Sequence, residues 1–212
     1  MKFYKLTAIL LSFFLLTGFS DKANDEIKND FEFFEGIHYQ KLNQKVDIAP
    51  YKKQVTEIFF YGCPHCYYLE PSLQKWLKTK AKDVHFEQMP AVLKSANWIF
   101  MARVYYTAVA LGIEKQFHPA YFKAIQGDKK EIFTLTQLAK FSEPMGIKPN
   151  DYKQMFKSFK VNQMVQKAKV KTEIYNAEGV PAIIINGKYL TDVTMATSRK
   201  KLWELVDYLT NK

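Results

Sequence analysis

Cysteine is scarce in this sequence, because only two of the 212 residues, Cys63 and Cys66, are cysteines. Small secreted domains that are stabilised by disulfides carry several bridges, so this shortage excludes such a scaffold. Glycine is also sparse, with eight residues, while aromatic residues make up 16% of the chain. This composition indicates a folded protein with a buried core and not a disordered chain.

Long apolar runs are absent apart from one near the start of the chain. Two lysines precede an apolar segment at residues 6–16, and the small residues Gly18 and Ser20 follow it. This order is typical of a secretory signal peptide, and the run is shorter than the roughly 20 residues of a membrane-spanning helix. We therefore expect a signal peptide at residues 1–20, with an uncleaved N-terminal anchor as the alternative. The mature protein is expected to be exported and soluble.

Acidic residues are outnumbered by basic ones, 21 to 31, which gives a net charge of +10. Loss of residues 1–20, which hold two lysines and no acid, would lower this charge to +8. The basic residues are spread over separate polar stretches: KTKAK, GDKKE, KSFK and QKAKVKTE. They indicate solvated helix faces rather than the clustered basic surface of a nucleic-acid-binding protein.

Residue patterns that predict β-strands lie before and after a long region that is predicted to be helical. QVTEIFFY, residues 54–61, is rich in β-branched and aromatic residues and predicts a buried strand, and VHFEQM, residues 84–89, predicts a second. Apolar residues at helical spacing predict a helix between them, from residue 64 to about residue 80. Residues 95–169 are expected to be helical throughout.

The last part of the chain returns to a strand pattern. PAIIINGKYL, residues 181–190, predicts a hairpin with its turn at Asn186-Gly187. An amphipathic helix is predicted from Ser198 to Leu209. The order of elements therefore predicts an α/β core that is interrupted by a helical insertion.

The two cysteines form a Cys-Pro-His-Cys motif directly after the first predicted strand. As a zinc site, the motif supplies only two ligands, and the four histidines of the chain show no paired spacing. As a structural disulfide, it would close a very short loop and constrain the unfolded chain little. A redox-active pair is the third interpretation, and the position of the motif favours it.

Cys63 stands at the predicted start of a helix, where unpaired N–H groups and the helix dipole favour a thiolate. The pKa of Cys63 is therefore expected below the free value of about 8.5. Pro64 suits the first helical position, and His65 adds a donor or a positive charge near the sulfur. Cys66, one turn on, is expected to be the less exposed, resolving thiol. A stabilised thiolate favours the reduced pair, which makes the Cys63–Cys66 disulfide oxidising.

Two further stretches, GVPA at residues 179–182 and the NGKY that follows the Ile-rich strand, complete a pattern. Together with CPHC they resemble the DsbA family of exported thiol:disulfide oxidoreductases, over nearly the whole chain after the leader. The resemblance implies a thioredoxin-like core, with a central mixed sheet flanked by helices, at residues 21–94 and 170–212. It also implies a helical domain inserted at residues 95–169.

The resemblance also implies that Pro181 follows a cis peptide bond and faces the cysteines. Val180 would then offer its backbone groups to an extended substrate peptide. The alternative is an ordinary trans-proline that opens a strand. With Pro64 and His65 beside the reactive sulfur, the expected substrate-binding residues are Pro64, His65, Val180 and Pro181.

Glu57 is an acid within a predicted buried strand, where a carboxylate is costly without a partner or a role. By analogy with the family, Glu57 is expected to take the proton of Cys66 during thiol exchange. The alternative is that Glu57 faces solvent at a sheet edge. Glu70, on the helix after the motif, is expected to be a surface acid.

The expected activity is donation of the Cys63–Cys66 disulfide to unfolded, newly exported proteins in the periplasm, through a mixed disulfide at Cys63. The resemblance implies reoxidation by a quinone-linked membrane protein. It implies no metal or organic cofactor. We also expect a monomer and, from the spread of the basic residues, no nucleic-acid partner. One alternative is a disulfide isomerase or reductase of the same superfamily. The absence of room for an N-terminal dimerisation domain and the Val180 before Pro181 argue against it. The other alternative is a non-catalytic, peptide-binding chaperone.

Overall fold

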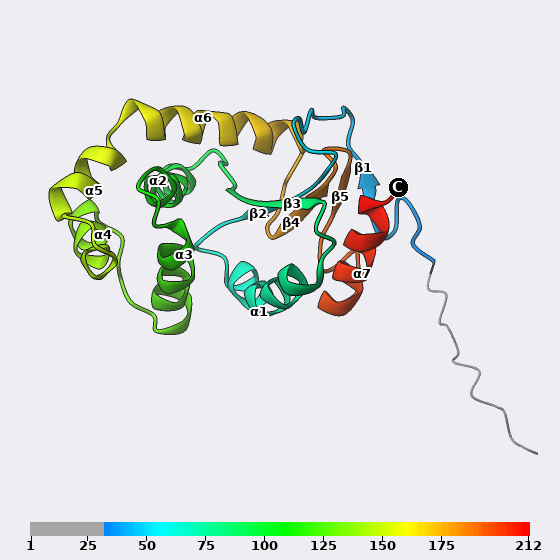
Figure 1. Ribbon diagram of the computed structural model, residues 1–212, viewed down its shortest axis with the longest axis horizontal. Coiled ribbons are helices and arrows are strands. Elements are labelled where there is room, and N and C mark those ends of the chain that lie inside the picture. The colour runs from blue at the N-terminus through cyan, green and yellow to red at the C-terminus, as the bar shows by residue number, and fades with distance from the viewer. Residues whose placement is uncertain (1–31) are drawn as a thin grey trace, which may run out of the picture. The chain divides into compact units, whose positions relative to one another are not determined.

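A mixed sheet of five strands organises the described part of the chain, residues 32–212 of a computed structural model (Figure 1). The strands lie in the order β1 (Gln40–Lys41), β5 (Tyr189–Thr191), β4 (Ala182–Ile185), β2 (Lys53–Phe59) and β3 (Val84–Pro90). β2 pairs in parallel with β3 and antiparallel with β4, so β2 is an inner strand. The expected mixed sheet with flanking helices is confirmed. The signal peptide predicted at residues 1–20 lies outside the described residues.

Helices connect the strands and cover the sheet. α1 (Pro64–Thr79) joins β2 to β3, and α7 (Arg199–Thr210) closes the chain. The elements between β3 and β4 are α2 (Ala96–Ala110), α3 (Glu114–Phe122), the π-helical turn η1 (Lys123–Gly127), α4 (Leu135–Phe141), the 3₁₀ turn η2 (Glu143–Met145), α5 (Pro149–Phe156) and α6 (Phe159–Ile174). The exact domain limits remain a prediction, and α6 runs across the boundary expected at residue 169.

Side chains of β2 alternate between the two faces of the sheet, as the pleat of a strand requires. Val55 packs among residues of α1 and α7 on one face. Ile58 packs among residues of α6 and α2 on the other face. Figure 1 shows α1 and α7 on one side of the sheet and α6 on the opposite side. Burial of each such side chain contributes about 1.5–3 kcal/mol, so both layers hold β2 in place.

The predicted hairpin is present, with its turn at Asn186 and Gly187. Both residues have positive φ angles, 53° and 59°, as a two-residue turn between twisted strands requires. The Lys188 N–H donates to the Ile185 carbonyl at 2.9 Å and closes the turn. The turn thereby orients β4, which begins one residue after Pro181.

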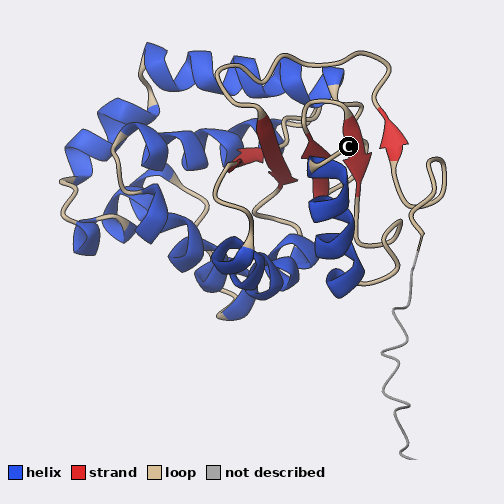
Figure 2. Cartoon of the chain, turned by 45° about the vertical axis from the view of Figure 1, so that its right-hand side comes forward, coloured by secondary structure: helices blue, strands red, loops and turns tan. Residues whose placement is uncertain are grey.

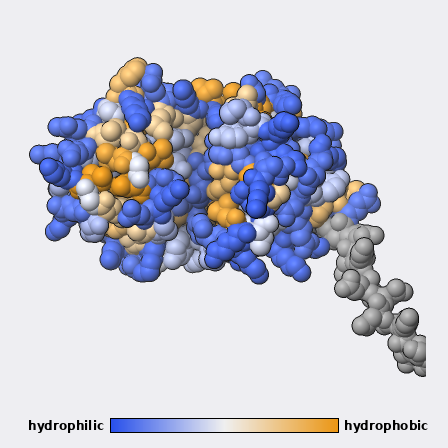
Figure 3. All heavy atoms as spheres, viewed as in Figure 1, coloured by the Kyte–Doolittle hydropathy of each residue, from blue (hydrophilic) through white to orange (hydrophobic). Residues whose placement is uncertain are grey.

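The helices between β3 and β4 gather largely to one side of the sheet (Figure 2). In the view of Figure 3, hydrophobic surface lies mainly over these helices and near the middle of the molecule. Within residues 32–212, no helix combines the length and apolar character that crossing a membrane requires.

Candidate active site

Cys63 occupies the N-cap position of α1, and Pro64 takes the first helical position. The backbone of Cys63 is extended, with φ −96° and ψ 114°, and its N–H donates to the Phe60 carbonyl at 2.9 Å. Both cysteines are free thiols in the structure. Cys63 is half-buried and Cys66 is fully buried, which confirms the predicted difference in exposure.

The Cys66 side chain donates a hydrogen bond that lowers the pKa of Cys63 to about 6. The backbone N–H groups of Cys66 and His65 and the charge of His65 lower this pKa further, while partial burial opposes them. The predicted direction is therefore correct, but the largest cause is the neighbouring thiol rather than the helix terminus. The sequence could not show that the Cys66 thiol has the largest effect on this pKa, because the effect depends on the side-chain geometry of the reduced pair.

The same arrangement raises the pKa of Cys66, chiefly through burial, then through the hydrogen bond to Cys63 and the charge of Glu57. At neutral pH, Cys63 is therefore largely a thiolate and Cys66 keeps its proton. A half-buried anionic nucleophile and a fully buried protonated thiol have different roles in exchange chemistry. The pair is suited to form its mixed disulfide at Cys63.

In the folded chain, Val180 and Pro181 lie beside the cysteine motif. The bond between them is cis, as expected. The Cys63 Sγ lies 3.4 Å from the Val180 carbonyl oxygen, which brings the two segments into contact. A cavity of about 210 Å³ lies beside them, lined by His65, Val180, Pro181, Asp192, Val193, Thr194 and Arg199. Pro64 and His65 are exposed at this place.

Glu57 lies in the inner strand β2 and is completely buried, so the alternative of a solvent-facing edge position is excluded. Burial, followed by the charge of Glu70, raises the pKa of Glu57 to about 8, and a hydrogen bond from Gln88 partly opposes this. The Gln88 Nε2 donates to Glu57 Oε2 at 2.8 Å. Among the described residues, Glu57 Oε1 has no hydrogen-bond partner. Glu57 is thus a buried carboxyl group that holds a proton near neutral pH.

Glu70 is not the surface acid that the sequence led us to expect. Its side chain is 13% exposed, and its Oε1 lies 3.1 Å from Gln88 Nε2 and 3.2 Å from His118 Nε2. Glu70 points inward because it follows Cys66 by one helical turn and shares its face. Gln88 could have been found as the register partner of Glu57 in β3. No pattern in the sequence indicated that α3 would bring His118 to this place.

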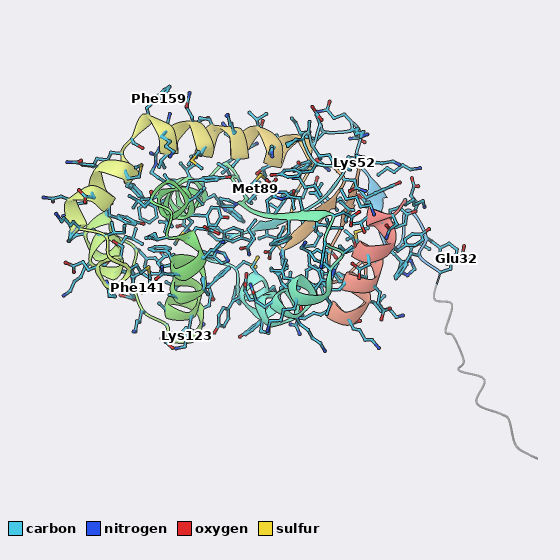
Figure 4. All side chains as sticks on the ribbon, viewed as in Figure 1. Glu32, Lys52, Met89, Lys123, Phe141 and Phe159 are labelled. Atoms are coloured by element: carbon cyan, nitrogen blue, oxygen red, sulfur yellow. The ribbon has the colours of Figure 1, made fainter. Side chains whose placement is uncertain are left out.

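Side chains fill the space between the sheet and the helices on both faces, as the stick view in Figure 4 shows.

Within residues 32–212, no group of three or more histidine, cysteine, aspartate or glutamate side chains is arranged to hold a metal ion. The chemistry that the arrangement supports is exchange at sulfur. Its parts are a stabilised thiolate, a buried second thiol and a buried carboxyl group.

Comparison with known proteins places this arrangement in a family. The family described as DSBA-like thioredoxin domain matches residues 54–208. The thiol:disulfide interchange protein DsbA of Pseudomonas aeruginosa is 32% identical over 208 residues, which cover 98% of this chain and 94% of that protein. The crystal structure of Pseudomonas aeruginosa DsbA has a TM-score of 0.78 at 32% identity, over 84% of this chain and 93% of that one.

A DsbA of Proteus mirabilis with the non-covalently bound peptide PWATCDS is also similar, with a TM-score of 0.70 and 26% identity. The likeness covers 85% of this chain and 100% of that one. The family match extends from the strand before the cysteine motif into the last helix, and so includes both segments that meet at Cys63. The chain therefore belongs to the DSBA-like thioredoxin domain family and is a thiol:disulfide oxidoreductase.

Proposed function

We propose that this oxidoreductase donates its Cys63–Cys66 disulfide to unfolded proteins that have been exported to the periplasm. The observation that carries the proposal is the difference in pKa between the two cysteine thiols. Cys63 has a pKa lowered to about 6 by the Cys66 hydrogen bond, whereas burial raises the pKa of Cys66. A stabilised Cys63 thiolate favours the reduced pair and makes the disulfide a good donor.

The proposed reaction has two exchange steps. A substrate thiolate attacks the Cys63 sulfur, the Cys63–Cys66 bond breaks, and Cys66 leaves with the bonding electrons. The Cys66 thiolate takes a proton, for which Glu57 is the proposed donor. A second substrate thiolate then attacks the substrate sulfur of the mixed disulfide, and Cys63 leaves as a stable thiolate. The substrate gains a disulfide, and the protein gains the two electrons.

The peptide-bound relative from Proteus mirabilis supports the proposal that this chain also binds a substrate peptide. We expect an extended peptide to pair with the backbone at Val180, which brings its cysteine to Cys63. Pro64, His65 and Pro181 complete the proposed contact surface, with the cavity of about 210 Å³ beside it. Backbone pairing recognises any extended chain, so we expect low sequence specificity.

Turnover requires an oxidant for the dithiol form. In this proposal a quinone-linked membrane protein removes the two electrons and restores the Cys63–Cys66 disulfide. The periplasmic location rests on the family and on the signal peptide expected at residues 1–20. We expect the enzyme to act as a monomer, without metal or organic cofactor.

The test uses the oxidised protein and a reduced, unfolded substrate with two thiols. The wild-type protein is expected to oxidise one substrate molecule per disulfide, whereas Cys63→Ser loses this activity completely. A chaperone would bind the unfolded substrate equally well after Cys63→Ser and would show no oxidation in either form. An isomerase would instead rearrange a substrate with mispaired disulfides faster than it oxidises a reduced one. Either of these results would contradict the proposal.

A further inference from the structure

A hydrogen-bonded cluster of Glu57, Gln88, Glu70, His118 and Tyr61 lies behind the cysteines. Its centre is the Gln88 Nε2, which is 2.8 Å from Glu57 Oε2 and 3.1 Å from Glu70 Oε1. An amide nitrogen has two hydrogens and accepts none, so donation to both carboxyl groups uses its full capacity. The two acids therefore share one neutral donor, although they come from different elements, β2 and α1.

The contact with Glu70 determines which nitrogen of His118 carries a proton. His118 Nε2 lies 3.2 Å from Glu70 Oε1, and a carboxylate oxygen only accepts, so the Nε2–H is the donor. On the other side of the ring, His118 Nδ1 lies 2.9 Å from the Tyr61 hydroxyl, and burial raises the pKa of Tyr61 well above its usual value. Glu70 thus receives donors from His118 and Gln88, which is the role of an ionised carboxylate.

The two acids differ in their access to water. Glu57 is completely buried, and among the described residues its Oε1 has no partner. Glu70, Gln88 and His118 line a cavity of about 860 Å³ between α1 and α3. Figure 4 labels Lys123, another lining residue, just after α3. When two carboxyl groups lie close together, one of them holds a proton, and burial decides that it is Glu57.

We infer that Glu70, held in place by His118, is a positioning residue that keeps Glu57 protonated and ready to protonate the Cys66 sulfur. The inference rests on the proposed disulfide donation. When the Cys63–Cys66 bond breaks, Cys66 keeps the bonding electrons and the Glu57 proton moves to its sulfur. Glu57 is left as a carboxylate beside the fixed charge of Glu70. That charge favours the return of a proton from water in the cavity, which restores the protonated carboxyl group of Glu57.

The titratable groups around Glu57 come from three helices. Cys66 and Glu70 face it from α1, and Tyr105 faces it from α2. His118 of α3 lies behind Gln88, with its Nε2 3.2 Å from Gln88 Nε2. Burial raises the pKa of Tyr105 well above its usual value, so Tyr105 stays neutral. β3 contributes the uncharged Gln88, and β4 contributes the register partner Ile183. In the oxidised protein Cys66 carries no proton, so Glu70 is the charged group that acts on Glu57.

The experiment measures the titration of the Glu57 carboxyl carbon by nuclear magnetic resonance in the oxidised, isotope-labelled protein. The wild-type midpoint is expected near pH 8. In Glu70→Gln it is expected to fall by about one pH unit, because a nearby like charge is removed. Glu114→Gln is the matched control, since Glu114 lines the same cavity and the change removes the same charge. That control is expected to leave the midpoint unchanged.

His118→Gln provides the second variant, because a glutamine retains a donor and an acceptor for Glu70 and Tyr61. A smaller downward shift is expected, with no further shift when it is added to Glu70→Gln. The alkaline decline in the rate of disulfide donation is expected to move with the Glu57 midpoint in each variant. The inference is overturned if Glu70→Gln and Glu114→Gln titrate alike, or if the two cluster substitutions act additively. A wild-type protein that oxidises no substrate would instead refute the proposed function.

Discussion

The Sγ of Cys63 lies 3.4 Å from the carbonyl oxygen of Val180, a residue 117 positions further along the chain. This contact joins the helix that stabilises the thiolate to the loop that precedes β4. A peptide paired with the backbone at Val180 would therefore have its own sulfur within reach of Cys63. The contact therefore brings the stabilised thiolate at the start of α1 next to the proposed peptide-binding backbone at Val180.

The first prediction concerns the cause of the Cys63 acidity. Cys66→Ala removes the hydrogen bond that contributes most to lowering the pKa of Cys63, so this pKa is expected to rise above about 6. Cys66→Ser keeps an O–H donor at the same position and is expected to retain a lower value than Cys66→Ala. Ultraviolet absorbance of the thiolate against pH measures both. Identical midpoints in the two variants would show that the helix terminus and His65 are sufficient.

The second prediction concerns the stability of the two redox forms. The folded-state pKa of Cys63, about 6, lies below the ordinary value of 9.0 because the Cys66 thiol donates to the thiolate. The resulting stabilisation of the reduced form is therefore fully present above pH 9 and is lost as the pH falls through 6. We expect the reduced form to resist denaturant better than the oxidised form, most clearly near pH 9, because above that pH the raised pKa of Cys66 acts in the opposite direction.

Denaturant unfolding of both forms at several pH values checks this. Equal midpoints throughout, or an advantage of the reduced form that grows on acidification, would contradict the mechanism.

The third prediction concerns Glu57→Gln. Burial raises the folded-state pKa of Glu57 from 4.5 to about 8, so the wild-type protein loses stability as the pH rises between these values. Glu57→Gln does not lose stability in this way, because the glutamine side chain does not titrate. Its free energy of unfolding is therefore expected to exceed that of the wild type increasingly up to pH 8, by an amount on the order of 5 kcal/mol.

Disulfide donation by Glu57→Gln is expected to be slower at neutral pH, because glutamine has no proton to give to Cys66. Glu87→Gln, at the partly exposed neighbouring position in β3, serves as the control for both measurements. A donation rate equal to that of the wild type would remove Glu57 from the proposed reaction.

The fourth prediction concerns the hairpin that orients β4. Gly187 has a φ of 59°, and a Cβ atom there would lie 2.3 Å from the Val46 carbonyl oxygen. Gly187→Ala is therefore expected to lower the free energy of unfolding by about 1–3 kcal/mol. Gly179→Ala is the control, since a Cβ at Gly179 meets no atom within 4 Å. Equal thermal stability of the two variants would show that the turn tolerates a side chain.

Local features of this protein could be predicted from its sequence. The cysteine motif lies at the start of α1, and the Asn186-Gly187 turn joins β4 to β5. Both depend on residues that are neighbours along the chain, such as Pro64 at the first helical position. The alternation of β2 places Glu57 on the face of Val55, towards α1, for the same reason.

The long-range part of the site was decided only by the tertiary structure. Whether Glu57 lay inside the sheet depended on the strand order, which places β2 between β3 and β4. Glu70 became a partly buried partner because α3 packs His118 against it, 48 positions further along the chain. Local spacing contains no information about which helix covers which face, since that choice depends on the packing of the whole core. The sequence by itself determined the reactive thiol, and the packing of α1, α3 and β3 determined the carboxyl groups around it.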